Sequence, residues 1–413
     1  MNGAEYRRYL IITATLFLVG YAMIVGSNWL IDPYDIHDVP RIEGFNARKP
    51  EFANHLRMIK AHAVRLKRPQ SVLLGTSRAE FGLDPDHPAL TADGSRSYNL
   101  GIVGANMYEA MRYLQHAHAA GPLVRAVLAL DLFAFNIFWK NSKDFSEERL
   151  LVTASGKQTS GFGGETLSVL ASFDTLRASV RTIQKQEKAL EARVYLPNGM
   201  ADPNHLIQMM QKDGGQRAGF LKSENGFLEM VYLPDDKYIH RFSDPLSGRS
   251  TFDYFRNIVT FCRAEGIDLR LFISPAHARQ WEILAAAGLW PHWEHWKRKL
   301  VSILDDLGKN RPDHPVPHLW DFSGYNSVTT EDVPQADDAS SLMRGYLESS
   351  HYNAKVGNMV LDTIFGRPSA GEAKLGDFGT ILTPENIEEH LAAIRTDRQA
   401  YRATHNNDLN DIA

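Results

Sequence analysis

The most restrictive feature of this sequence is an uncharged, apolar run near its N-terminus. From Tyr9 to Ile31 no charged side chain occurs, and Leu, Ile, Val, Ala and Phe predominate. A helix needs ~20 such residues to cross the hydrocarbon core of a bilayer. Arg7 and Arg8 precede the run, and positively charged flanks stay on the cytoplasmic side. We therefore expect a single-pass inner-membrane anchor over residues 9–31, with residues 1–8 cytoplasmic and the rest on the periplasmic or extracytoplasmic side.

An alternative interpretation of the apolar run is a secretory signal peptide that is removed after export. Such peptides end in a cleavage site of small residues, of the A-x-A kind, and no clear site of this kind follows Ile31. A buried helix of a soluble domain is disfavoured as well, because no polar face interrupts the pattern. We therefore favour an uncleaved signal-anchor.

Composition and charge exclude several other classes of protein. The formal net charge of the 413-residue chain is -4, whereas a nucleic-acid binder needs a basic face that neutralises phosphates. No nucleic-acid partner is therefore expected. The only cysteine is Cys262, which excludes a disulfide framework and a zinc site built from cysteines. His292 and His295 lack the H-E-x-x-H pattern of zinc proteases, and we predict neither a metal nor a cofactor.

Strand and helix patterns alternate along the rest of the chain. Short apolar runs that end in turns predict strands at 71–75, 97–101, 124–132, 268–274 and 317–322. Amphipathic segments predict helices at 105–120, 251–265 and 352–365. Such alternation indicates βαβ units around a parallel sheet. The predicted fold class is α/β, a three-layer α/β/α arrangement with a mostly parallel, flavodoxin-like sheet of about five strands, to which an N-terminal transmembrane helix and a long helical insertion are added.

The alternating region defines the main domain, which we predict over residues 70–366. A long insertion at about 135–245 interrupts it, and insertions of this size in α/β enzymes often form lids. Residues 32–69 are predicted to be a membrane-proximal helical segment. Residues 367–413 are predicted to be a linker and an amphipathic helix, the helix over 384–402.

Short polar and titratable residues follow several of the predicted strands. In chain order these residues are Ser77, Arg78, Asp131, Asn136 and His277, with Glu348 and His351 further on. Doubly wound sheets bind ligands at the carboxyl ends of their strands, so we expect these groups to converge. Acyl transfer needs a hydroxyl nucleophile, a base, an orienting carboxylate and oxyanion donors. Glu348 and His351 are three residues apart and thus close enough to interact directly.

Three short blocks resemble, in their order, those of the SGNH (GDSL-like) hydrolases. The segment Gly75–Arg78 follows an apolar strand and resembles the block that carries the nucleophilic serine. The segment Asn99–Gly104, with the pattern N-x-G-x-x-G, resembles the block whose last glycine lends a backbone N–H to the oxyanion hole. The segment Glu348–His351 resembles the last block, usually Asp-x-x-His.

The resemblance implies a role for each of these residues. Ser77 is then the nucleophile, His351 its base and Glu348 the carboxylate that orients the imidazole. The backbone N–H groups of Ser77 and Gly104 then form the oxyanion hole.

The sequence departs from the family pattern in two places. Glu348 stands where the last block usually has Asp, which keeps the charge but lengthens the side chain by one methylene. The third block, Gly-x-Asn-Asp, has no clean match, and residues 130–136 occupy its place. Asn136 is a candidate for the third oxyanion donor, and Asp131 for a structural or site-lining role. For Arg78 a structural ion pair is favoured over binding of a substrate carboxylate.

Two expectations remain open at this stage. His277 is predicted either to contact substrate near the mouth of the site or to be a plain surface histidine. The residues around Trp290 to Trp296 are predicted to form an aromatic helical face.

A single membrane span joined to such a domain is similar to envelope proteins that add or remove acyl groups on secreted polysaccharides and cell-wall polymers. The resemblance therefore implies a serine-dependent O-acyl ester hydrolase or O-acyltransferase. One alternative is a catalytically silent scaffold that binds glycan through the insertion and the aromatic face at Trp290 to Trp296. Another is a partner subunit of a multi-span membrane acyltransferase.

Overall fold

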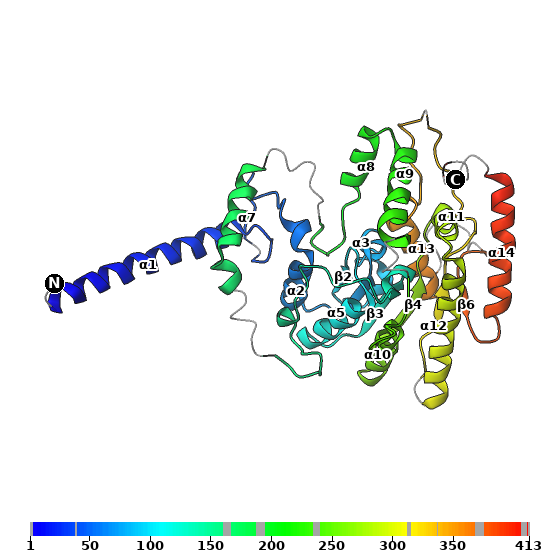
Figure 1. Cartoon of the computed structure of the whole chain (residues 1–413), viewed down its shortest axis with the longest axis horizontal. Coiled ribbons are helices and arrows are strands. Elements are labelled where there is room, and N and C mark those ends of the chain that lie inside the picture. The colour runs from blue at the N-terminus through cyan, green and yellow to red at the C-terminus, as the bar shows by residue number, and fades with distance from the viewer. Residues whose placement is uncertain are drawn as a thin grey trace. The chain divides into compact units, whose positions relative to one another are not determined.

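The computed structural model describes residues 3–37, 39–159, 167–186, 195–233, 240–311, 315–336, 338–367, 376–405 and 411. The chain divides into two compact units. The first consists of Met1–Leu66 and Asp144–Val194, and the second of Lys67–Lys143 and Tyr195–Ala413. Figure 1 labels many of the helices and strands of both units.

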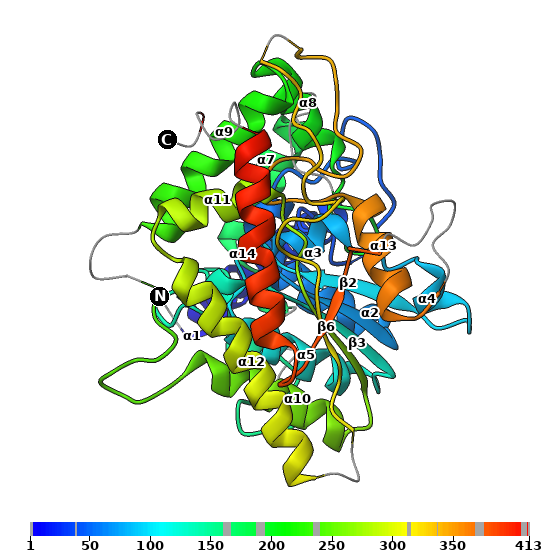
Figure 2. The same ribbon diagram turned by 90° about the vertical axis from the view of Figure 1, so that its right-hand side faces the viewer.

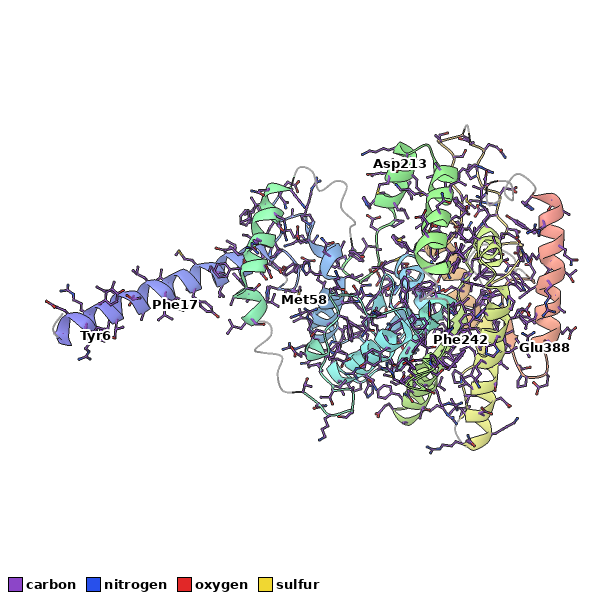
Figure 3. All side chains as sticks on the ribbon, in the orientation of Figure 1. Tyr6, Phe17, Met58, Asp213, Phe242 and Glu388 are labelled. Carbon is purple, nitrogen blue, oxygen red and sulfur yellow. The ribbon has the colours of Figure 1, made fainter. Side chains whose placement is uncertain are left out.

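The first unit carries the apolar N-terminal helix. Helix α1 spans Gly3–Ile31, and its most apolar 18-residue window has a mean hydropathy of 2.1. By length and composition this helix can cross a membrane. Tyr6 and Phe17 project outward from it, and Phe17 is 72 % exposed (Figure 3). Such exposure of large apolar side chains suits a helix that is surrounded by lipid.

A buried asparagine fastens the end of α1 to the rest of its unit. The unit also contains the 3-10 turns η1 (Phe52–His55) and η3 (Glu147–Arg149) and the helices α2 (Leu56–Lys67) and α7 (Phe173–Gln184). Asn28 on α1 is fully buried: its Nδ2 donates to the carbonyl oxygen of Leu170 (2.7 Å), and its Oδ1 accepts from the hydroxyl of Ser179 on α7 (2.9 Å). These hydrogen bonds satisfy a buried amide and fasten α7 to α1.

The second unit is built around a six-stranded, mostly parallel sheet. Its strands are β1 (Ser71–Gly75), β2 (Ser97–Gly101), β3 (Arg125–Leu130), β4 (Asp268–Ile273), β5 (Leu319–Asp321) and β6 (Thr380–Leu382). They lie in the order β2-β1-β3-β4-β5-β6; the first five are parallel, and β6 is antiparallel to β5. The prediction of an α/β fold with a mostly parallel sheet is thus confirmed.

Helices and short turns connect and cover these strands. They are α3 (Ser77–Gly82), α4 (Pro88–Thr91), α5 (Met107–Ala120), η2 (Leu132–Phe135), α8 (Asn204–Lys212), α9 (Gln216–Phe227), the π-helical turn η5 (Leu228–Tyr232), α10 (Thr251–Ala264), α11 (Ala278–Ala286), α12 (Trp290–Asn310), α13 (Ala354–Ile364) and α14 (Ile387–Thr404). Every residue of β1 is buried, as expected of a central parallel strand covered on both faces.

The C-terminal segment is part of the second unit. Strand β6 adds a sixth strand beyond the predicted five, and its three residues are too few to give a readable pattern. Helix α14 runs beside α12 (Figure 2), where Arg395 forms an ion pair with Glu294 (2.6 Å). The linker predicted before this helix lies outside the described residues at 368–375.

The long insertion is shared between the two units. Residues 144–194, with α7, belong to the first unit, and the following stretch, with α8 and α9, belongs to the second. Glu224 on α9 forms a buried ion pair with Arg279 on α11, at 2.7 Å. Because of such contacts, α9 is an integral part of the second unit.

Candidate active site

Ser77 lies at the turn between the first strand and the helix that follows. It is the first residue of α3 and is 8 % exposed. Thr76 is the N-cap of this helix: its Oγ1 accepts from the backbone N–H of Arg78 (3.3 Å) and donates to Asp131 Oδ2 (2.6 Å). A capping threonine satisfies one of the free N–H groups of the first turn. The strand-to-helix turn therefore presents Ser77 at the carboxyl end of β1.

His351 lies in a tight loop between β5 and α13. The backbone N–H of Leu347 donates to the carbonyl of His351 (2.9 Å), and Tyr346 and Tyr352 form an isolated antiparallel bridge. His351 Nε2 lies 2.7 Å from Ser77 Oγ. Two side chains far apart in the sequence thus meet within hydrogen-bond distance, as the sequence analysis requires of a nucleophile and its base.

Glu348 occupies the other side of the imidazole. Its carboxylate accepts from the backbone N–H groups of Ser350 (2.9 Å) and His351 (3.0 Å), and also from His351 Nδ1. Burial alone would raise the pKa of Glu348, but its electrostatic interaction and hydrogen bond with His351 outweigh burial and lower the pKa below its ordinary value. A carboxylate can only accept, so Nδ1 carries the ring proton. The lone pair of Nε2 then faces the Ser77 hydroxyl.

Close packing of α13 on α3 brings the two segments together. A Cβ on Gly357 would lie 1.7 Å from the carbonyl oxygen of Gly82, and a Cβ on Gly82 would lie 2.0 Å from the ring of Tyr352. Only glycine permits backbones to approach so closely. This contact sets the distance between α3, which begins at Ser77, and the histidine loop, which precedes α13.

Two backbone N–H groups are suitable oxyanion donors. Strands β1 and β2 are in register at Gly75 and Gly101, so the turns after them are neighbours. Gly104 has a positive φ of 63°, a conformation that favours glycine, and its carbonyl accepts from the indole of Trp139 (2.7 Å). Within the described ranges, no acceptor takes the N–H of Ser77 or that of Gly104. Both are therefore available to a ligand oxygen.

Asn136 follows η2 and holds a loop. Its Oδ1 accepts from the backbone N–H groups of Phe138 (3.2 Å) and Arg241 (3.3 Å). It also lines a hollow together with Trp139. Its amide oxygen is used by the backbone, so a role as oxyanion donor would depend on its Nδ2 group.

Arg78 and Asp131 form a buried ion pair beside the nucleophile. Arg78 Nη1 lies 2.7 Å from Asp131 Oδ1, and Arg78 Nε donates to the hydroxyl of Ser350 (3.0 Å). Burial would lower the pKa of Arg78, but Asp131 outweighs it and raises the pKa. The guanidinium lies over the rings of Phe133 and Phe227, 5.6 and 5.8 Å from their centroids. The ion pair expected for Arg78 is present, and it links α3, the end of β3 and the histidine loop.

His277 is neither a surface residue nor free to contact a substrate. It is 1 % exposed and is the N-cap of α11. Its Nδ1 accepts from the backbone N–H of Arg279 (3.2 Å), and its Nε2 donates to the carbonyl of Glu331 (2.7 Å). The prediction of a surface or substrate-contacting histidine is therefore wrong. Its backbone N–H donates to the carbonyl of Ser349 (2.9 Å) and so supports the histidine loop.

The aromatic face predicted around residues 290–296 is mostly interior. Trp293 and Trp296 have no exposed surface. Trp293 stacks on Trp281, with ring centroids 4.9 Å apart. These two side chains pack in the core and are not part of an exposed aromatic face.

Several residues that hold the site were missed by the sequence analysis. Gln216 on α9 donates to the carbonyls of Tyr346 (2.6 Å) and Leu347 (3.0 Å), and Ser223 on the same helix hydrogen-bonds Glu348. Both belong to the insertion, and no local pattern indicates where an insertion packs. Thr76 could have been found, because a threonine directly before a helix is a capping signal.

No protein-family model matches this chain, and no curated protein does so either. The function is therefore inferred from the geometry of the site and from the motif resemblance.

Proposed function

We propose that this chain is a membrane-anchored serine hydrolase or acyltransferase of the SGNH type. The observation that carries the proposal is the continuous hydrogen-bonded chain from the hydroxyl of Ser77 through the imidazole of His351 to the carboxylate of Glu348. Such a chain activates a hydroxyl that is otherwise a weak nucleophile. The strand order β2-β1-β3-β4-β5 supports a three-layer, flavodoxin-like domain.

The proposed reaction begins with an ester. Ser77 Oγ attacks the carbonyl carbon while His351 Nε2 takes the hydroxyl proton, and the negative carbonyl oxygen is received by the N–H groups of Ser77 and Gly104. Asn136 is the candidate for a third donor. His351 then delivers the proton to the departing alkoxide, which leaves an acyl group on Ser77. Glu348 stabilises the imidazolium that forms between the two transfers.

The second half of the reaction decides between the two activities. A water molecule, deprotonated by His351, attacks the acyl-Ser77 ester and releases a carboxylic acid. A sugar hydroxyl in its place yields a new ester and makes the protein an O-acyltransferase. Both outcomes use the same three side chains.

We further propose that the substrate is an acylated envelope or secreted polysaccharide. The helix α1 supports a site held close to a membrane. Arg7 and Arg8, on the N-terminal side of the apolar run, favour placement of the second unit in the periplasm. A multi-span acyltransferase in the same membrane would be a suitable partner, and co-purification of the two would support this assignment.

A fluorophosphonate probe tests the proposal directly, because it labels activated serines covalently. We expect labelling of the wild-type protein and none of S77A. S323A is the matched control, since Ser323 is also a buried serine close to a histidine–carboxylate pair, and it should label as strongly as the wild type. A folded wild-type protein that does not react would favour the alternative, a catalytically silent scaffold that binds glycan.

A further inference from the structure

A hollow of about 540 Å³ lies beside the candidate active site in the second unit. It is formed by the start of α5, the loop after η2 and the start of α10. The side chains that carry the argument are Tyr108, Trp139, Tyr254, Asn141, Lys140 and Arg249. This set is called the Trp139 hollow below.

The Trp139 hollow adjoins the proposed oxyanion hole. The indole of Trp139 donates to the carbonyl of Gly104 at 2.7 Å, and a Cβ on Gly104 would lie 3.7 Å from the Trp139 ring. Asn136, the candidate third donor, also lines the hollow. A polymer with one unit at Ser77 could therefore extend into this hollow.

The side chains of the hollow are of the types that bind sugars. Trp139, Tyr108 and Tyr254 are partly exposed, and the two tyrosine rings meet edge to face with centroids 5.2 Å apart. Exposed aromatic rings pack against the apolar C–H faces of sugar rings while polar groups bind the hydroxyls. Asn141 is exposed, and its Oδ1 accepts from Asn106 (2.9 Å), so its amide hydrogens point to other partners.

The charges of the lining side chains indicate which class of sugar the hollow binds. Lys140 and Arg249 are exposed, no acidic side chain lines the hollow, and neither cation has an ion pair among the described residues. Arg249 shares a turn with Asp244, whose backbone N–H donates to the carbonyl of Arg249 (2.9 Å), and Arg249 Nε donates to the hydroxyl of Ser247 (3.2 Å). The pKa of Asp244 is lowered first by hydrogen bonds from Ser247 and Leu246, and the charge of Arg249 lowers it as well. Two exposed cations that form no ion pair among the described residues, in a chain of net charge -4, favour an anionic ligand.

We propose that the Trp139 hollow binds a carboxylate-bearing sugar unit, so that the polymer recognised by this protein is an acidic polysaccharide. Lys140 and Arg249 bind the carboxylate, and Trp139 packs against the sugar ring. The claim that this unit neighbours the acylated sugar rests on the proposed function; the claim that the hollow binds an acidic sugar does not.

Affinity electrophoresis of the detergent-solubilised full chain tests this inference. We expect polygalacturonate in the gel to retard the wild-type protein, whereas neutral dextran leaves its mobility unchanged. The double variant K140A/R249A should bind polygalacturonate about tenfold more weakly or worse, because it loses two charge-assisted contacts. The matched control, K299A/K309A, removes two exposed lysines of α12 and should bind like the wild type.

Variants of Trp139 distinguish binding of a sugar ring from nonspecific electrostatic attraction of a polyanion. W139A should weaken binding of polygalacturonate about tenfold, W139F should retain most of it, and neither should change retardation by dextran sulfate. The inference is overturned if the wild type is not retarded by polygalacturonate, if the control loses as much as K140A/R249A, or if W139A binds like the wild type.

The same gels separate this inference from the proposed function. S77A should be retarded as strongly as the wild type. If polygalacturonate retards a protein that no fluorophosphonate labels, the acidic-sugar site is supported and the proposed enzymatic function is contradicted. If the protein is labelled but not retarded, the enzymatic function is supported and the acidic-sugar site is contradicted.

Discussion

His351 with Glu348 and His390 with Asp321 are both histidine–carboxylate pairs of the second unit, and both have a serine hydroxyl in contact. In the first pair the carboxylate binds one ring nitrogen and Ser77 the other, at 2.7 Å. In the second pair His390 Nε2 lies 2.8 Å from Asp321, and the hydroxyl of Ser323 is also bound to Asp321. Ser323 and His390 therefore bind the two oxygens of the same carboxylate, and no hydrogen bond joins these two described residues to each other.

A buried lysine is a second feature that distinguishes the His390–Asp321 pair from the His351–Glu348 pair. Lys297 Nζ lies 2.6 Å from Asp321 Oδ2 and donates to the hydroxyl of Ser323 (2.8 Å). Burial would raise the pKa of Asp321, but Lys297 and His390 outweigh it and hold the pKa well below its ordinary range. Asp321 is thus paired in charge with Lys297, and among the described residues no histidine nitrogen contacts the hydroxyl of Ser323. The second cluster joins α12, β5 and α14 through buried polar contacts to Asp321.

For catalysis, the order in which a serine, a histidine and a carboxylate are hydrogen-bonded therefore matters more than their proximity. A catalytic relay needs the imidazole between the hydroxyl and the carboxylate. Where the carboxylate lies in the middle, the same three residue types make a buried polar network.

Replacing the two histidines gives the largest expected contrast. H351Q removes the base, so kcat/KM for hydrolysis of p-nitrophenyl acetate should fall on the order of a thousandfold or more. H390Q should leave kcat/KM within about threefold, since His390 does not face a nucleophile. A large loss of activity in H390Q with unchanged folding would contradict the distinction between the two pairs.

Removing the charge of Asp321 should lower the stability of the protein, whereas H351Q should lower its activity. D321N leaves the buried ammonium of Lys297 without its counterion, which should lower the free energy of unfolding by about 3 kcal/mol at pH 7. Urea unfolding of the wild type and D321N, followed by circular dichroism, measures this difference. E348Q, measured in parallel, tests whether the first carboxylate carries a comparable share of the stability.

The pH dependence of this effect has a definite sign. The folded-state pKa of Asp321 lies below that of the unfolded chain, about 3.9, so its contribution is complete above that pH. It is lost as the pH falls through the lower, folded-state value. The difference between wild type and D321N should consequently shrink as the pH is lowered below about 4. A difference that grows on acidification would refute the assignment.

The addition of a single methyl group tests how the His351–Glu348 pair is held in place. G357A puts a methyl group where the carbonyl of Gly82 lies, so α13 must move away from α3. A misplacement of about 1 Å can cost a hundredfold in rate, and we expect a loss of about that size in kcat/KM. G308A is the control, because its Cβ meets only ordinary contacts, the nearest at 3.6 Å, and it should keep full activity.

Much of the second unit could be predicted because its signals are local. The apolar runs at 71–75 and 97–101 are β1 and β2 with the predicted bounds. The order of the motifs singled out Ser77 and His351, which do meet. Local hydrophobic pattern and turn chemistry decide where strands begin and end, so these features are readable without knowledge of the packing.

Other features depend on contacts between distant segments. Nothing near His277 indicates that Glu331 accepts from its ring, and Trp293 is buried only because α12 packs against α11. The support that Gln216 gives to the histidine loop likewise follows from the position of the insertion.

By itself the sequence determined the apolar helix, the parallel strands and the candidate nucleophile and base, because each is encoded by neighbouring residues. Only the tertiary structure decided which histidine–carboxylate pair has its imidazole facing a serine and which is paired in charge with Lys297. The physical reason is that hydrogen-bond connectivity and burial are properties of the packed chain, where one displaced helix changes the partner of a side chain without any change in sequence.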